Sequence, residues 1–172
     1  MYDYDKYSSL EGYADDIIEI CEALNLMHVC LVGHSVSAII GLLAAVKRPS
    51  LFQKLIMIGP SPRYINDDDY FGGFSQNDID DLMETLDSNY LGWSSAMASV
   101  IMDNPDSPEL AAELEESFCQ SNPKIARHFA KVTFLGDNRS DLKKLTTDTL
   151  IIQSKTDAIA SIKVGQFMHD NI

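Results

Sequence analysis

The stretch "LVGHSVSAIIG", residues 31–41, constrains the fold of this chain more than any other feature of its sequence. The short apolar run "MHVCLVG" ends at Gly33 and predicts a buried strand. A single serine, Ser35, then leads directly into "SVSAIIGLLAAVKRP", which predicts a deeply buried helix that stops before Pro49. A strand that turns into a helix at a glycine and a serine predicts a nucleophile elbow.

The elbow carries a specific chemical expectation for Ser35. A serine hydroxyl attacks only when a base removes its proton and hydrogen-bond donors receive the developing oxyanion. On a sharp strand-to-helix turn the serine oxygen stands above the sheet, and we expect the backbone N–H of Val36 to be one oxyanion donor. The pattern Gly33-His34-Ser35-Val36-Ser37 departs from G-x-S-x-G at its last position, where Ser37 is still small. In the alternative interpretation, Ser35 only N-caps a core helix.

The remaining apolar segments predict an α/β architecture. A helical pattern precedes the elbow strand, and a second buried strand covers Leu55 to Ile58 and ends in a Gly-Pro-Ser-Pro turn. A third strand, "DTLIIQS", is followed by a polar turn and a helix start. This alternation predicts a parallel sheet covered by helices on both faces. Asp157 follows the third strand directly and is the expected triad acid; alternatively, it caps the helix that begins near Ala160.

A helical insertion interrupts this alternation. Four helix-length pieces, separated by Asn or Ser caps and by prolines, run from Gln76 to about Phe134. Such insertions lie over the carboxyl edge of the sheet, where ligands bind, so we expect a lid. The predicted organisation is a first core segment with the elbow (1–74), the helical lid (75–136) and a second core segment with the acid strand and its helix (137–172).

Composition limits the partners. With 26 acidic and 13 basic residues the net charge is −13, which argues against nucleic acid and anionic membranes as partners. The three cysteines show no metal-binding spacing, and Cys21 and Cys30 lie in apolar patterns typical of small buried side chains. No apolar run approaches the length of a membrane span, and the acidic N-terminal residues do not form a signal peptide. The sequence therefore predicts a cytoplasmic protein without metal or cofactor.

The run from Gly33 to Phe74 resembles the RsbQ-type α/β-hydrolases of bacteria and their plant relatives, the karrikin and strigolactone receptors. The resemblance continues through "NYLGW", "NPKIARHFAKVTF" and "LIIQSKTDAIAS". It implies an α/β-hydrolase fold with Ser35 as nucleophile and Asp157 as acid, under a V-shaped lid of four helices that encloses an apolar pocket. It also implies pocket-lining roles for three lid aromatics, although apolar residues at helical spacing equally fit plain lid core. These are Trp93, Phe129 and Phe134.

The resemblance further implies a serine hydrolase acting on a small apolar ester or lactone. Its RsbQ-type members work with a PAS-domain phosphatase in energy-stress signalling, through sigma-factor regulation. The sequence has no counterpart of the family's first strands or of the segment that bears the catalytic histidine, so we expect a fragment with little hydrolytic activity. None of the histidines is a convincing base, and His34 is assigned a packing or supporting role; the four are His28, His34, His128 and His169. The rival interpretations are a ligand-binding signalling module and a non-functional fragment with an exposed sheet edge.

Overall fold

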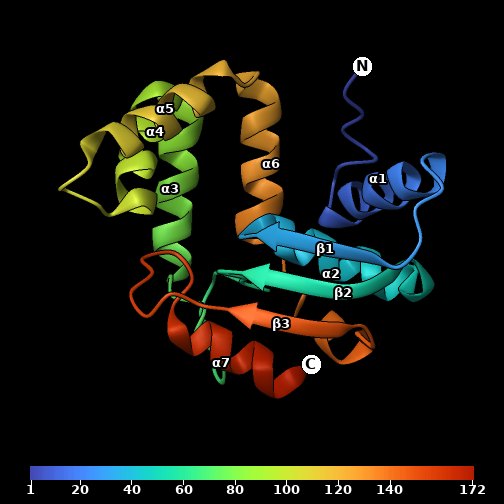
Figure 1. The fold of residues 1–172 in the computed structure, drawn as a ribbon. Helices are drawn as coiled ribbons and strands as arrows, with labels where there is room; N and C mark the ends of the chain where they lie inside the picture. Colours follow the sequence, from blue (N-terminus) through green and yellow to red (C-terminus); the bar gives the residue numbers. More distant parts are fainter.

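A computed structural model describes all residues, 1–172. It shows a small sheet with helices against it and a group of helices beyond the tips of its strands (Figure 1). In chain order the elements are α1 (Leu10–Ala23), β1 (Val29–His34), α2 (Val36–Lys47), the 3₁₀ helix η1 (Pro49–Leu51), β2 (Phe52–Ile58), α3 (Gln76–Ser88), α4 (Tyr90–Met102), α5 (Pro108–Gln120), α6 (Pro123–Leu135), the 3₁₀ helix η2 (Arg139–Lys144), β3 (Asp148–Ile152) and α7 (Ile162–Asn171). None of the helices combines the length and the apolar character that a membrane crossing requires.

The predicted parallel sheet is confirmed. Its three strands lie in the order β1-β2-β3, and both neighbouring pairs are parallel. In this register Val32 lies beside Ile56, which in turn lies beside Leu150. The second strand begins earlier than predicted, at Phe52, directly after η1.

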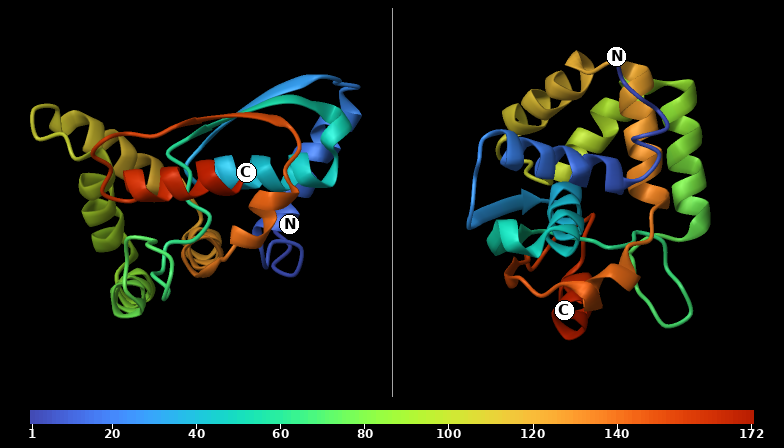
Figure 2. Two further views of the ribbon diagram at one scale, coloured as in Figure 1. Left: turned by 90° about the horizontal axis from the view of Figure 1, so that it is seen from below. Right: turned by 90° about the vertical axis from the view of Figure 1, so that its right-hand side faces the viewer.

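Helices cover one face of this sheet, so the expectation that both faces are covered is wrong for these residues. Helices α1, α2 and α7 lie on the same side (Figure 2), where Leu55 and Met57 are fully buried. On the other face Val32 and Leu150 are 57% and 50% exposed. The strand order explains this result, because right-handed crossovers that always step to the next strand place every helix on the same face. Cys30 also proves exposed rather than buried, whereas Cys21 is buried as predicted.

The four predicted helices of the insertion form α3 to α6 between β2 and β3. Local signals set their starts: Ser75 and Asp78 form a capping box before α3, and the side chains of Asn89 and Asn122 accept N–H bonds at the starts of α4 and α6. The insertion has a hydrophobic core of its own, which includes Ile79 and Leu86. This core is separate from the one beneath the sheet. It stands beyond the carboxyl ends of the strands, where the elbow also lies (Figure 1).

Candidate active site

Ser35 is the single residue between β1 and α2. Its backbone has φ 55° and ψ −126°, a conformation that costs a non-glycine residue about 1–3 kcal/mol. Two hydrogen bonds hold it there: its N–H donates to the carbonyl of Ile58 (2.8 Å), and its own carbonyl accepts from the N–H of Ala38 (3.0 Å). The Ser35 hydroxyl makes no capping hydrogen bond, so the interpretation of this residue as a simple helix cap is wrong.

Gly33 explains how the strand and the helix approach so closely. A Cβ atom at this position would lie 2.6 Å from the carbonyl oxygen of Ser37 and 2.7 Å from the N and Cα atoms of Ala38. Only glycine fits such a contact with backbone atoms. Because the contact involves the backbone of Ser37 and not its side chain, a serine is accommodated where the strict motif has glycine.

The N-terminus of α2 begins at Val36 and borders the cavity above the elbow. The first N–H groups of a helix have no partner within the helix, and the helix dipole places partial positive charge there. The Val36 N–H is one of these first N–H groups, at the border of the cavity.

Asp157 lies in the turn after β3, as predicted, but it does not cap α7. That helix begins at Ile162 with Ser161 before it. The Asp157 Oδ1 atom instead accepts from the backbone N–H groups of Ile159 and Ala160, each at 2.9 Å, which fixes the turn. The second oxygen, Oδ2, points across the sheet edge toward Gly59, at the end of β2, and lies 3.5 Å from the place of a Cβ atom there.

Asp157 and His34 both lie next to Gly59, which has no side chain to separate them. The Cδ2 and Nε2 atoms of the His34 ring each lie 3.9 Å from the same Cβ position. The Asp157 carboxylate and the His34 ring thus both lie beside Gly59, directly after the middle strand. Gly59 has a φ of 55°, which favours glycine for the turn itself as well.

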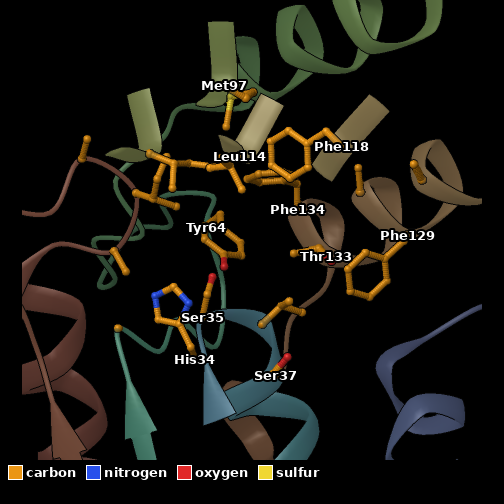
Figure 3. Close-up of a pocket in the computed structure, with 18 of the residues that line it drawn as sticks. His34, Ser35, Ser37, Tyr64, Met97, Leu114, Phe118, Phe129, Thr133 and Phe134 are labelled. Atoms are coloured by element: carbon orange, nitrogen blue, oxygen red, sulfur yellow. The ribbon is translucent and has the colours of Figure 1, made fainter. Parts of the chain in front are cut away.

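Tyr64 is a site residue that the sequence reasoning missed. It is 3% exposed, and its hydroxyl points toward Ser35 (Figure 3). Burial raises the pKa of Tyr64 above its ordinary value; hydrogen bonding with Ser35 opposes this shift, and the charge of Asp157 adds to it. The phenol therefore stays protonated at neutral pH. The available signal was an aromatic residue just after the Gly-Pro-Ser-Pro turn at the carboxyl end of a strand.

A cavity of about 1060 Å³ separates the elbow from the insertion. Ser35, Val36 and Asp157 line it on the sheet side. The three predicted aromatics, Trp93, Phe129 and Phe134, line it as well. Trp93 and Phe134 also belong to the hydrophobic core of the insertion, so lining and core roles coincide in these two side chains. The sequence reasoning missed several other lining residues: Met97, Leu114, Phe118 and Thr133.

The histidines do not supply an evident base for Ser35. His34 lies beside Ser35 in the cavity lining (Figure 3). The two side chains are not joined by a hydrogen bond. On α6, the Nε2 atom of His128 lies 2.9 Å from the carbonyl oxygen of Tyr7, and His169 on α7 pairs with Asp170. His28 is exposed just before β1. No group of three or more His, Cys, Asp or Glu side chains is arranged as metal ligands would be.

Proteins of known name resemble this chain over almost its whole length. A Karrikin insensitive 2 receptor of Petunia hybrida is 39% identical over 171 residues, which are 99% of this chain and 63% of the relative. A probable esterase of rice (Oryza sativa subsp. japonica) is 38% identical with the same coverage. The chain thus spans a little under two thirds of the length of these relatives.

Solved structures agree with the fold. A hydrolase from Oleispira antarctica superimposes with a TM-score of 0.97 at 44% identity, over 99% of this chain and 63% of that one. An esterase from Exiguobacterium antarcticum gives 0.87 at 25% identity, over 96% of this chain and 62% of that one. The family model described as the alpha/beta hydrolase fold matches residues 3–170. The strand-to-helix elbow and the parallel sheet are thus those of a known family, and this chain belongs to the α/β-hydrolases.

Proposed function

We propose that these residues form the core of an RsbQ-like serine hydrolase that acts on a small apolar ester or lactone. The observation that carries this proposal is the strained backbone of Ser35, which holds a hydroxyl that does not cap α2 on the floor of a largely apolar cavity. A backbone held in a rare conformation at the edge of a cavity is typical of functional positions. In this proposal Ser35 is the nucleophile, Val36 N–H is an oxyanion donor and Asp157 is the triad acid.

The general base is the missing part of this site. No histidine is hydrogen-bonded to Ser35, and both His128 and His169 have partners elsewhere. A triad without its base loses most of its rate, so we expect little hydrolysis by these 172 residues alone. A histidine from outside these residues would complete the triad, with Asp157 positioned to orient it.

Covalent labelling with a fluorophosphonate tests this assignment. We expect slow labelling of Ser35, located by peptide mass spectrometry, and faster labelling when free imidazole is added as a substitute base. The Ser35→Ala variant should not be labelled under either condition, and Ser37→Ala should be labelled like the unaltered chain. Labelling at a rate typical of serine hydrolases without imidazole would show that a base is present. If Ser35 stays unlabelled with imidazole, it is not the nucleophile.

A second candidate function is a ligand-binding signalling module. The observation that favours it is a large, mostly apolar cavity beside a serine that has no evident base. In this case the insertion presents a surface to a protein partner, for which the RsbQ resemblance suggests a PAS-domain phosphatase in cytoplasmic stress signalling. A ligand that raises the melting temperature without measurable turnover would favour this module. Saturable turnover that disappears in Ser35→Ala would favour the hydrolase.

A further inference from the structure

Gln153 is a polar residue that the site described above does not use. It comes directly after β3, four residues before Asp157, and its side chain packs against Gly165 of α7. The side chain does not line the cavity. Any contribution of Gln153 to the chemistry at Ser35 must therefore act through another residue.

The amide group of Gln153 is bonded to the turn that carries Asp157. Its Nε2 atom donates to the carbonyl of Ala160 and lies 3.5 Å from Asp157 Oδ2, at the outer limit of a hydrogen bond. The N–H of the same Ala160 donates to Asp157 Oδ1. The end of the strand, the turn and the carboxylate are thus joined into one hydrogen-bonded unit.

The other atom of this amide shows that Gln153 serves as a donor. Its Oε1 atom is buried and has no hydrogen-bond partner. If the nitrogen and oxygen exchanged places, an oxygen would face the Ala160 carbonyl and the Asp157 carboxylate, which can only accept. A buried acceptor without a partner is costly, so the side chain is held in place by its N–H contacts to the turn.

Gly165 makes room for the Gln153 side chain. A Cβ atom on Gly165 would lie 2.9 Å from Gln153 Cγ and 3.1 Å from Gln153 Oε1. Glycine inside a helix is less favourable than alanine. Helix α7 thus carries an unfavourable residue at the position where Gln153 has to fit.

We propose that Gln153 is a positioning residue for the reaction at Ser35, because it holds the turn from Asp157 to Ala160 and so fixes the carboxylate that orients the base. This inference rests on the proposed function, in which Asp157 is the triad acid. The acid of a triad accepts an N–H from the base and so holds it in the correct orientation. A well-fixed carboxylate should therefore favour a base that offers such an N–H.

The test compares two small bases that replace the missing histidine, imidazole and 1-methylimidazole. Either base can take the Ser35 proton while the serine oxygen bonds to the phosphorus of a fluorophosphonate and fluoride leaves. Only imidazole has a second nitrogen with an N–H that Asp157 can accept. In the unaltered chain we expect imidazole to promote labelling about 10-fold better, the lower end of the range for a hydrogen bond to a charged group.

Four variants locate the source of this preference. Asp157→Ala should abolish it, because the acceptor is gone. Gln153→Met keeps the length of the side chain without its N–H groups and should reduce the preference to about 3-fold or less. Gln153→Glu has the same shape but only accepts when ionised, so it should act in the same way and replaces Gln153→Met if that variant does not fold. The matched control is Gln166→Met, because Gln166 is an exposed amide on α7 that donates to Asp170; it should keep the full preference.

The ratio of the two rates separates positioning from a purely structural role, since a loss of folded protein lowers both rates by the same factor. A reduced ratio in Gln153→Met that Gln166→Met does not share supports the proposal. A full ratio in Gln153→Met, where Asp157→Ala loses it, overturns the role of Gln153 and leaves Ser35 and Asp157 in theirs. If neither base promotes labelling, the proposed nucleophile fails, and the role of Gln153 fails with it. If the two bases are equally effective in the unaltered chain, or Asp157→Ala keeps the preference, Asp157 is not the acid and both proposals are overturned.

Discussion

The backbone of Ser35 shows how one residue can serve the site at the expense of stability. Its positive φ places the hydroxyl above the sheet edge, and the hydrogen bond to Ile58 keeps it there. Glycine adopts such a conformation without strain, whereas any residue with a Cβ atom is strained in it. Retaining serine here thus opposes folding, which agrees with a chemical role for its hydroxyl.

This strain predicts the relative stability of two variants that both lack the hydroxyl. Ser35→Gly should be more stable than Ser35→Ala by about 1 kcal/mol, because only alanine keeps the strained Cβ atom. The measurement is the free energy of unfolding from urea titration. The control pair is Ser37→Gly and Ser37→Ala, within α2, where glycine should instead be less stable by about 1 kcal/mol. A Ser35→Gly variant no more stable than Ser35→Ala would show that the elbow is unstrained.

Sequence patterns identify some residues of the site and miss others, and the difference has a physical reason. Ser35 and Asp157 follow strands of a parallel sheet, whose carboxyl ends meet at one edge, so their positions follow from local patterns. Tyr64 lies in a loop without periodicity. Thr133 lies on an amphipathic helix whose orientation depends on its packing partners. No local pattern reveals that either side chain points into the cavity.

At the scale of elements, a network of ion pairs fixes the loop that carries Tyr64. The Arg63 Nη1 atom donates to Asp137 Oδ2 (2.7 Å), and Arg139 Nη2 donates to Asp137 and to Asp67 (2.7 and 2.9 Å). The loop after β2 is thereby joined to the segment after α6. Hydrogen bonding from Arg139, with a further contribution from Arg63, lowers the pKa of Asp137 to about 2.

This network predicts a pH-dependent effect of Asp137→Asn. A carboxyl whose pKa is lowered on folding stabilises the protein fully above its unfolded pKa, near 4, and loses that contribution as the pH falls toward 2. Partial exposure screens the ion pairs, so we expect the variant to lose about 1 kcal/mol at pH 7. Urea unfolding at a series of pH values should show the difference from the unaltered chain shrinking below about pH 4.

The control for this prediction is Asp106→Asn, because Asp106 is exposed and has no ion pair. It should leave the unfolding free energy nearly unchanged across the same pH range. A loss in Asp137→Asn that is equally large at pH 7 and near pH 3 would mean that the side chain acts through packing or neutral hydrogen bonds and not through its charge.

At the scale of the whole molecule, the layer arrangement is the part that the sequence predicts least well. Apolar periodicity correctly predicts the strands, the helices against them and the four helices of the insertion. It does not predict which face each helix covers, since that depends on the order of strands in the sheet. Val32 and Leu150 have the apolar character of buried strand residues, yet they lie on the uncovered face. Ile56, which lies beside both of them in the register, is only partly buried.

This uncovered face predicts self-association of the 172-residue chain. Parallel sheets occur almost always with both faces covered, and exposed apolar patches promote association. The outer edges of β1 and β3 also lack a neighbouring strand, and unpaired backbone groups at such edges likewise promote association. We expect light scattering after size-exclusion chromatography to give a mass above 19.1 kDa that rises with concentration.

Two substitutions on the face should reduce this association. Val32→Thr keeps a β-branched residue in the strand, and Leu150→Lys adds a charge that must remain in water, so the double variant should shift toward the monomer mass. The control is Ile20→Lys, which removes a similarly exposed apolar side chain from α1, away from the face, and should leave the association unchanged. An unaltered chain that is monomeric at all concentrations would contradict the prediction. If Ile20→Lys is as effective as the double variant, association is driven by general surface hydrophobicity and not by the open sheet.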